Sequence, residues 1–420
     1  MADPVYEFEL YDRANGSIGV LSAANGAFDA VGSYRLNQPT RWVTKFAASE
    51  FTGNGGDGYP LFEKLRRCLK VRRTRTDGFT TDIIFNGILC FVSITADQDD
   101  DYMIECTWFD PMVWWQYRYV RSTTGSLVNP TWASPISGAE ILLDALTNSV
   151  SNGGDPGDME GSLGLDLADG TFDTAGQPDL AMTLSNWPAT ISELASILLS
   201  TGAIDIKIDP VDDAGGYDPD IMGVLSILNP RGSDLSGSVS FQYATGAYNA
   251  KAARYTGDGF TVANKLWYYL GPKRTASRWA GNFTPPADSG AFATYGLDDG
   301  TLEAARDQSV TDLGTWMRIE VFDDNGNENL LRPLYAKRWQ TETLLRLYGR
   351  DLLHITPSID PGFYPFEDYN LGDLIAVETG SSFSRAISGT QRVYGFDVGP
   401  DNNGVERVSE LLTSADQEAL

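Results

Sequence analysis

The sequence contains a single histidine, and this residue limits the chemistry that the chain can perform. His354 lies in the stretch RDLLHITPS, between a leucine and an isoleucine. Ser-His-Asp catalysis, Cys-His catalysis and metal sites built on several histidines would all depend on it. A lone imidazole with aliphatic neighbours is more typical of a strand or core position. We therefore interpret His354 as structural, and we predict a protein that is not an enzyme and has no catalytic, cofactor or metal site.

Two aspartate-rich segments have the composition of calcium-binding loops without the spacing. The segment DDNGNENLL begins Asp-x-Asn-x-Asn, but its sixth position is Glu328, where an EF-hand loop needs glycine. Its twelfth position is Leu334 instead of glutamate. Residues 155–170 fail the same test. We interpret both segments as solvated turns.

Other catalytic motifs are missing from the sequence. It contains no Walker motif, no Gly-x-Ser-x-Gly elbow and no His-Glu-x-x-His helix. A glycosidase needs two carboxylates, but among 57 acidic residues such a pair is expected by chance and does not indicate this activity. The three cysteines, Cys68, Cys90 and Cys106, lack metal-ligand spacing. Their odd number is typical of buried thiols in a protein assembled in a reducing cytoplasm.

Two segments have the side chains of a binding surface. The basic run KLRRCLKVRRTR at 64–75 would either contact an acidic neighbouring subunit or form a solvated strand face. The run WFDPMVWWQYRYVR at 108–121 has aromatic and arginine side chains of the kind that stack on sugars or bases. Its alternation and its Asp-Pro turn favour a strand shared between a core and an interface.

The charge of the chain argues against one class of partner. Its 420 residues include 57 acidic and 31 basic side chains, for a formal net charge of −26. Like charges repel, so we expect no tight binding of nucleic acid, although DNA would still pass close by. The acidity would equally serve solubility. We see no signal peptide and no apolar run of about 18 residues, so we expect a soluble chain.

Periodicity predicts a chain of strands with a few helices. Residues 5–120 alternate as strands, and one hairpin turns at Thr76-Asp77-Gly78. Capping signals predict two helices, one starting after Ser137 and one after Thr190. Helical spacing predicts a third within residues 330–352. The stretch FEDYNLGDLIAV near the C-terminus predicts a tight turn at Gly372 and then a strand.

These elements predict a mainly β, multi-domain chain with a few helices, of the α+β class. The expected divisions are an N-terminal β-barrel-like domain at 1–121, a helix-containing connecting domain with a Gly/Asp-rich loop at 122–205, a second β-domain at 206–330 with an exposed loop at 272–292, and a helix with a C-terminal β-unit at 331–420.

Eight short motifs follow one another along nearly the whole chain. They are YRLNQP, LKVRRTRTDG, IIFNGILCFVSI, FDPMVWWQYRYVR, SFQYATGAYNAKAARYTGDGFTVANKLWYYLG, SVTDLGTWMRIE, EDYNLGDLIAVETG and QRVYGFDVGPDNNGVERVSELLT. Their order resembles that of the tail hub proteins, also called baseplate hub or minor tail proteins, of long-tailed bacteriophages, in particular phages of actinobacteria. Leu313 departs from the pattern, where the family has tyrosine.

This resemblance implies a structural virion protein at the tail tip with two tail-tube-like β-barrel domains. It implies a homotrimer that joins the distal tail protein ring to the central tip or fibre and to other minor tail proteins. The tape measure protein and DNA would pass transiently through its lumen. A closed ring needs large complementary subunit faces. Our candidate interface residues are Arg66, Arg67, Lys70, Arg72, Arg73, Arg75, Trp108, Trp114, Trp115, Tyr117, Arg118 and Tyr119.

Two other functions remain open from the sequence. One is a tail-associated enzyme that degrades the cell wall, which the single histidine disfavours. The other is a carbohydrate-binding receptor module, whose binding site would lie in residues 118–135 and in the loop 272–292.

Overall fold

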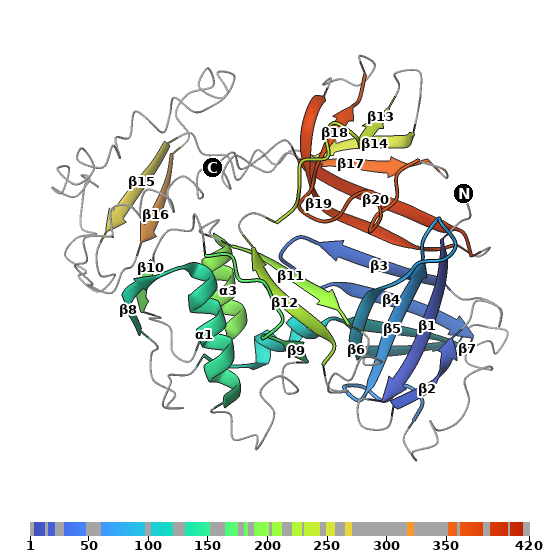
Figure 1. Ribbon diagram of the computed structural model, residues 1–420, viewed down its shortest axis with the longest axis horizontal. Helices are drawn as coiled ribbons and strands as arrows, with labels where there is room; N and C mark the ends of the chain where they lie inside the picture. Colours follow the sequence, from blue (N-terminus) through green and yellow to red (C-terminus); the bar gives the residue numbers. More distant parts are fainter. Residues whose placement is uncertain are drawn as a thin grey trace.

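Most strands of the computed structural model belong to one large sheet (Figure 1). The structure describes residues 4–12, 16–21, 29–47, 60–96, 102–120, 131–151, 164–174, 180–183, 189–200, 204–211, 221–228, 231–243, 249–256, 265–270, 317–322, 352–358, 362–380, 387–401 and 404–414. The prediction of a mainly β chain in several parts with few helices is confirmed.

Most of the elements fall into three groups. The N-terminal β-unit contains β1 (Val5–Asp12), β2 (Gly16–Leu21), β3 (Asp29–Arg35), β4 (Arg41–Ala47), β5 (Arg67–Thr74), β6 (Thr81–Ala96) and β7 (Tyr102–Phe109). The helical unit contains the 3-10 helix η3 (Pro111–Tyr117), β8 (Thr131–Ile136), α1 (Gly138–Ser151), β9 (Leu165–Asp166), β10 (Leu180–Thr183), α3 (Ile191–Ser200), β11 (Asp205–Pro210) and β12 (Gly223–Leu228). The C-terminal β-unit contains β13 (Ser240–Gln242), β14 (Ala250–Thr256), β17 (Leu352–Pro357), β18 (Leu374–Glu378), β19 (Ser388–Pro400) and β20 (Glu406–Ser414).

One strand path joins the first and last parts of the chain. Within the described ranges, thirteen strands form a sheet with the order β14-β17-β20-β19-β3-β4-β7-β6-β5-β1-β2, and β13 and β18 branch from β19. Strand β19 pairs with β18 at its start, with β3 over Gly395–Val398 and with β20 from Arg392 to its end. In Figure 1, β3 lies along the boundary between the blue and the red strands.

The sheets do not follow the division of the chain that we expected from the sequence. Strands β13 and β14, from the expected second β-domain, pair with strands after residue 350. Strands β11 and β12 instead form a smaller sheet with β9. In Figure 1 this smaller sheet lies between the helices and the N-terminal β-unit. A separate parallel pair is formed by β15 (Lys265–Leu270) and β16 (Met317–Phe322).

A chain of aromatic side chains crosses the boundary between the two β-units. Trp42 contacts Tyr34 with ring centroids 6.4 Å apart, and Tyr34 stacks on Phe396 of β19 at 5.1 Å. The ring centroid of Tyr369 lies 6.0 Å from that of Phe396 and 5.7 Å from that of Phe241. These residues belong to one hydrophobic core that both β-units share. A second core surrounds α1, α3, β11 and β12.

Both predicted helix starts are confirmed. The hydroxyl of Ser137 accepts from the backbone N–H of Glu140 at 3.2 Å, and the Glu140 carboxylate accepts from the Ser137 N–H at 2.8 Å. Thr190 and Glu193 form the same reciprocal pair at 3.1 and 2.7 Å. Each capping box satisfies donors that the first helical turn leaves free. No helix among the described residues is long and apolar enough to cross a membrane.

The aromatic run after β7 differs from our prediction. It forms the 3-10 helix η3 instead of a strand, and Asp110 caps it by accepting from the backbone N–H of Met112 at 3.0 Å. Pro111 suits the first helical position because its missing N–H needs no partner there. The predicted hairpin turn is confirmed, with Gly78 at φ 76° between β5 and β6. The predicted third helix, the loop 272–292 and the segment 323–331 lie outside the described residues.

Candidate functional site

The three units meet at Asp205, the first residue of β11. Its carboxylate pairs with Arg392 of β19 at 2.5 Å and accepts from the Asn37 side-chain amide at 2.7 Å and from the Arg231 N–H at 2.8 Å. Asp205 and Arg392 are 6% and 5% exposed, so the ion pair is fully buried. A buried pair is kept when its remaining hydrogen-bonding groups are satisfied, as they are around Asp205. This cluster joins one strand or loop from each unit.

The tight turn before β18 completes this junction. The Asp373 carboxylate accepts from the backbone N–H of Ser233 at 2.7 Å and of Asn370 at 2.6 Å. Gly372 has φ 88°, and a Cβ placed there would lie closer than 3.0 Å to the carbonyl oxygen of Arg231. Only glycine permits both this conformation and this approach. The turn predicted from the sequence is therefore confirmed, and it is a contact between units.

A second buried cluster links the N-terminal β-unit to the C-terminal one. Arg73 of β5 donates to both oxygens of Glu406 at 2.5 and 2.9 Å, and Tyr6 donates to the same carboxylate. Arg73 also pairs with Glu367 at 2.5 Å. Burial lowers the pKa of Arg73, but the hydrogen bond and charge of Glu406 outweigh it and raise the pKa above its ordinary value. The guanidinium therefore stays charged and bidentate, which ties β5 of the N-terminal β-unit to β20 of the C-terminal one.

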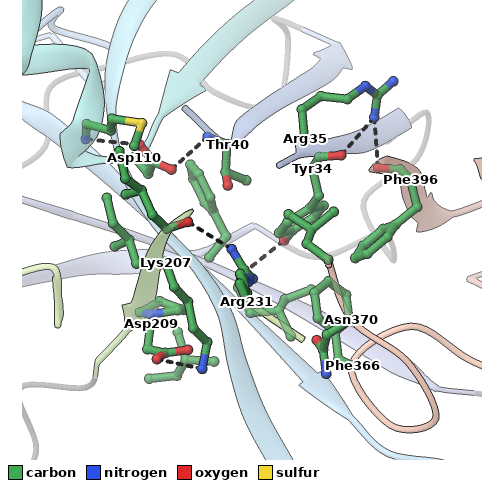
Figure 2. Close-up of a pocket in the computed structure, with 18 of the residues that line it drawn as sticks. Tyr34, Arg35, Thr40, Asp110, Lys207, Asp209, Arg231, Phe366, Asn370 and Phe396 are labelled. Atoms are coloured by element: carbon green, nitrogen blue, oxygen red, sulfur yellow. Dashed lines mark hydrogen bonds and ion pairs between the residues drawn. The ribbon is translucent and has the colours of Figure 1, made fainter. Parts of the chain in front are cut away.

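A cavity of about 390 Å³ lies beside the junction, and Arg231 and Asp373 are among the residues that line it. Its walls come from β3, β6, β11, β19 and the segment 366–373. Figure 2 shows Arg231 between Lys207 and Asp209 on one side and Tyr34 and Phe396 on the other. Lys207 and Asp209 form an ion pair at 2.8 Å. The cavity is thus lined by both aromatic rings and charged groups.

Asp110 lines the same cavity and titrates near neutrality. Burial raises the pKa of its carboxyl to about 7, even though the backbone N–H groups of Thr40 and Met112 donate to it at 2.6 and 3.0 Å. An unfolded aspartic acid has a pKa of about 3.9. Between these values the folded chain holds a proton that the unfolded chain does not, so this residue's contribution to stability falls as pH rises from about 4 to about 7.

We expect Asp110→Asn to remove this pH dependence. Three pKa units correspond to on the order of 4 kcal/mol, so the wild type should lose that much more unfolding free energy than the variant between pH 4 and pH 7.5. Urea unfolding at several pH values measures both curves. All other acidic residues are common to the two proteins and cancel in the difference. Parallel curves would show that Asp110 is ionised throughout.

The basic candidates are mostly paired inside the chain. Arg67, Arg73 and Lys70 are no more than 4% exposed. Arg66 and Arg67 pair with Asp12 at 2.6 and 2.7 Å, and Arg72 pairs with Glu9 at 2.5 Å. Within the chain, strand β1, which pairs with β5, supplies the acidic partners of these three arginines.

Two further basic candidates have other contacts. Arg75 pairs with Asp82 across the hairpin at 2.5 Å. The ammonium of Lys70 lies 5.2 Å from the ring centroid of Tyr11.

The aromatic candidates divide into buried and exposed residues. Trp108 and Trp115 are 0% and 1% exposed and belong to the two cores, so they support the fold and present no surface. Trp114 is half-buried near Cys90. Tyr117 and Tyr119 are 75% and 44% exposed, and Arg118 is half-buried between them. These last three residues keep the surface position that an interface needs.

His354 lies in β17 as a strand residue. Its Nδ1 is 2.7 Å from a carboxylate oxygen of Glu410 on β20 and 3.0 Å from the guanidinium of Arg254 on β14. Glu410 also contacts Arg35 of β3 at 3.3 Å. Among the described residues, no three His, Cys, Asp or Glu side chains are grouped closely enough to hold a metal ion.

The junction residues were not predicted as a site, although the sequence motifs contain three of them. Asn37, Asp373 and Arg392 lie in the motifs YRLNQP, EDYNLGDLIAVETG and QRVYGFDVGP, which carry the resemblance to tail hub proteins. In the structure Asn37 and Arg392 both bond to Asp205, and Asp373 holds the adjacent turn. Asp205 and Arg231 lie outside those motifs and had no such signal.

Comparison with known proteins supports the fold. No family model matches the sequence, and no curated protein sequence matches it. The structure is similar to the 43 kDa tail protein of prophage MuSo2 from Shewanella oneidensis, with a TM-score of 0.55, 14% identity, and coverage of 97% of this chain and 98% of that chain. It is also similar to a tail protein from Neisseria meningitidis MC58, with a TM-score of 0.54, 11% identity, and coverage of 98% and 97%. The chain therefore shares the fold of these two tail proteins.

Proposed function

We propose that this chain is a structural subunit of a phage or phage-like tail, acting as the hub at the tail tip. Three copies would form a ring between the distal tail protein ring and the central tip or fibre. The actinobacterial-phage type stays a prediction from the motifs, and the two structural neighbours come from Shewanella and Neisseria. The chain would be made in the host cytoplasm and function in the virion.

The observation that carries this proposal is the fold shared along nearly the full length of two tail proteins. Fold alone does not define function, but here it agrees with the order of the sequence motifs. The architecture also suits a protein that transmits mechanical force. Buried ion pairs and a shared aromatic core join the three units, so that force applied to one unit is transmitted to the others.

The exposed side chains at the end of η3 support a contact between copies. Tyr117, Arg118 and Tyr119 lie at the end of η3, and Tyr119 forms a β-bridge with Thr190. Tyrosine and arginine are enriched at the centres of protein interfaces. We propose these three residues, with Arg66, Arg72, Arg75 and Trp114, as the remaining candidates for a subunit face. The net charge of −26 would let DNA and the tape measure protein pass through a lumen without tight binding of the nucleic acid.

We expect the purified chain to form a trimer of about 137 kDa, three times the 45.8 kDa chain. Light scattering coupled to size-exclusion chromatography measures the mass, and an antibody against the chain should label the tail tip of particles in electron micrographs. A monomer that is missing from particles would overturn the proposal. Clearing of cell walls in a zymogram would favour the enzyme, and binding on a glycan array would favour the receptor module.

A further inference from the structure

One cation that lines the cavity beside the junction, Arg231, makes no ion pair with any described residue. The charged residues that line this cavity are Arg35, Arg75, Asp82, Asp110, Lys207, Asp209, Arg231 and Asp373. The three other cations each pair with a carboxylate. The two carboxylates without a cation, Asp110 and Asp373, each accept from two backbone N–H groups. The guanidinium of Arg231 makes a single hydrogen bond, from Nη1 to the Ile206 carbonyl at 3.1 Å.

The backbone of Arg231 holds this side chain in place. Its N–H donates to Asp205 at 2.8 Å, its carbonyl accepts from Arg392 at 3.2 Å, and Gly372 packs against the same carbonyl. Burial lowers the pKa of Arg231, although the charges of the nearby aspartates act in the opposite direction. The guanidinium is therefore fixed by the junction, while Nε and Nη2 remain as donors without an acceptor in the described part of the chain.

Strand β11 offers another donor beside this guanidinium. The N–H and C=O of Ile206 face away from β12, because they bond to the Asn37 side chain at 2.8 Å and to Arg231. Backbone groups of an antiparallel strand alternate with a period of two, so those of Ile208 face the same way. Within the described ranges nothing bonds to these groups of Ile208, which also lines the cavity. Its N–H is thus free to donate next to Arg231.

The rest of the cavity combines an apolar wall with an opening to solvent. Figure 2 shows the rings of Tyr34, Phe366 and Phe396 across the cavity from Lys207 and Asp209. The side chains of Lys207 and Asp209 are 36% and 48% exposed, so the cavity is accessible on their side as it stands. Small-molecule sites have volumes of about 300–1,000 Å³ and combine apolar walls with a few polar groups. The cavity meets both criteria.

We propose that this cavity binds a ligand with a terminal carboxylate beside one apolar group. The carboxylate accepts from the unused guanidinium nitrogens of Arg231 and from the Ile208 N–H, and the apolar group lies against the three rings. The planar fork of arginine matches the two oxygens of a carboxylate. The nearby acids have partners of their own, because Asp205 and Asp209 pair with other cations and Asp373 accepts from backbone N–H groups. This site goes beyond the proposed tail function and is tested without reference to it.

The test measures binding of N-acetyl-L-phenylalanine to the full-length chain by isothermal titration calorimetry. The amide of this compound has the same ring and no charge, so it serves as the matched ligand. We expect the acid to bind about tenfold or more tightly than the amide, because hydrogen bonds between ionised groups are about twice as strong as neutral ones. Arg231→Met should remove this advantage and leave the affinity for the amide unchanged.

Lys45→Met is the matched control variant. It removes an exposed cation that pairs with Glu105 and does not line the cavity, so it should change neither affinity. Circular dichroism verifies the fold of each variant. If Arg231→Met does not fold, Arg231→Lys provides the second variant, which keeps the charge without the planar fork and should lose part of the preference for the acid.

A preference for the acid that depends on Arg231 supports the site. Equal affinities for acid and amide, an equal loss in Lys45→Met, or no measurable binding of the acid would overturn it. A longer peptide that ends in phenylalanine separates two sources of the same chemistry. Binding that is tighter than that of the single residue supports the terminus of a polypeptide as the ligand, and weaker binding supports a free small molecule.

Discussion

Replacing Asp205 with alanine is expected to lower the free energy of unfolding by about 3–5 kcal/mol, the loss seen when one partner of a buried ion pair is removed. The variant leaves the Arg392 guanidinium without its anionic partner at a site that is 5% exposed. It also removes the acceptor for the Asn37 amide and for the Arg231 N–H. Because these groups come from all three units, the loss should appear in each unit and not only in the helical one.

Asp209→Ala is the matched control for this prediction. Asp209 lies on the same strand, and its side chain is 48% exposed and paired with Lys207, itself 36% exposed. Exposed pairs contribute about 0–1 kcal/mol, so this variant should stay close to wild type in urea unfolding followed by circular dichroism. The double variant Asp205→Ala, Arg392→Met should recover part of the loss, because it no longer buries an unpaired charge. Equal effects of Asp205→Ala and Asp209→Ala would contradict the central role of the junction.

Gly372→Ala should be the other severe substitution. A left-handed backbone costs an L-residue about 1–2 kcal/mol. Overlap of the new methyl group with the Arg231 carbonyl should add about 1–3 kcal/mol, the usual cost of overpacking. That carbonyl is backbone and also accepts from Arg392 at 3.2 Å, so it cannot move away without disturbing the junction.

Gly404→Ala separates the two causes. Gly404 has φ 78°, close to that of Gly372, but no atom of the described residues lies within 4 Å of its Cβ position. This variant should therefore lose only the conformational part, and thermal unfolding of the two variants side by side gives the difference. If both lose the same amount, the close approach at Gly372 has no energetic cost.

Features encoded within a few residues were predictable from the sequence. The two capping boxes and the hairpin turn depend on contacts that span three or four positions, so the local sequence contains the whole signal. The run after Asp110 also contained a local signal, an N-cap followed by Pro111. Its alternating aromatic residues favoured a strand, but the segment forms the 3-10 helix η3 that Asp110 caps.

The site itself depends on contacts between distant parts of the chain. Arg73 and Glu406 are separated by 333 positions, and Arg392 and Asp205 by 187. No periodicity encodes such pairs, and a basic run has the same composition whether it faces a partner or the interior. Only the pairing of β1 with β5 brings Glu7 opposite Arg72 and Glu9 opposite Lys70.

The triple pairing of β19 has a consequence for synthesis on the ribosome. Strand β3 is made early, yet its hydrogen-bonding partner across Gly395–Val398 is translated some 360 residues later. At about 5–20 residues per second, the exposed edge of β3 waits on the order of tens of seconds for that partner. Unpaired edges are templates for aggregation, so this interval calls for chaperone protection. A chain that terminates before β19 cannot pair β3 with its C-terminal partner, so only complete molecules join the two β-units.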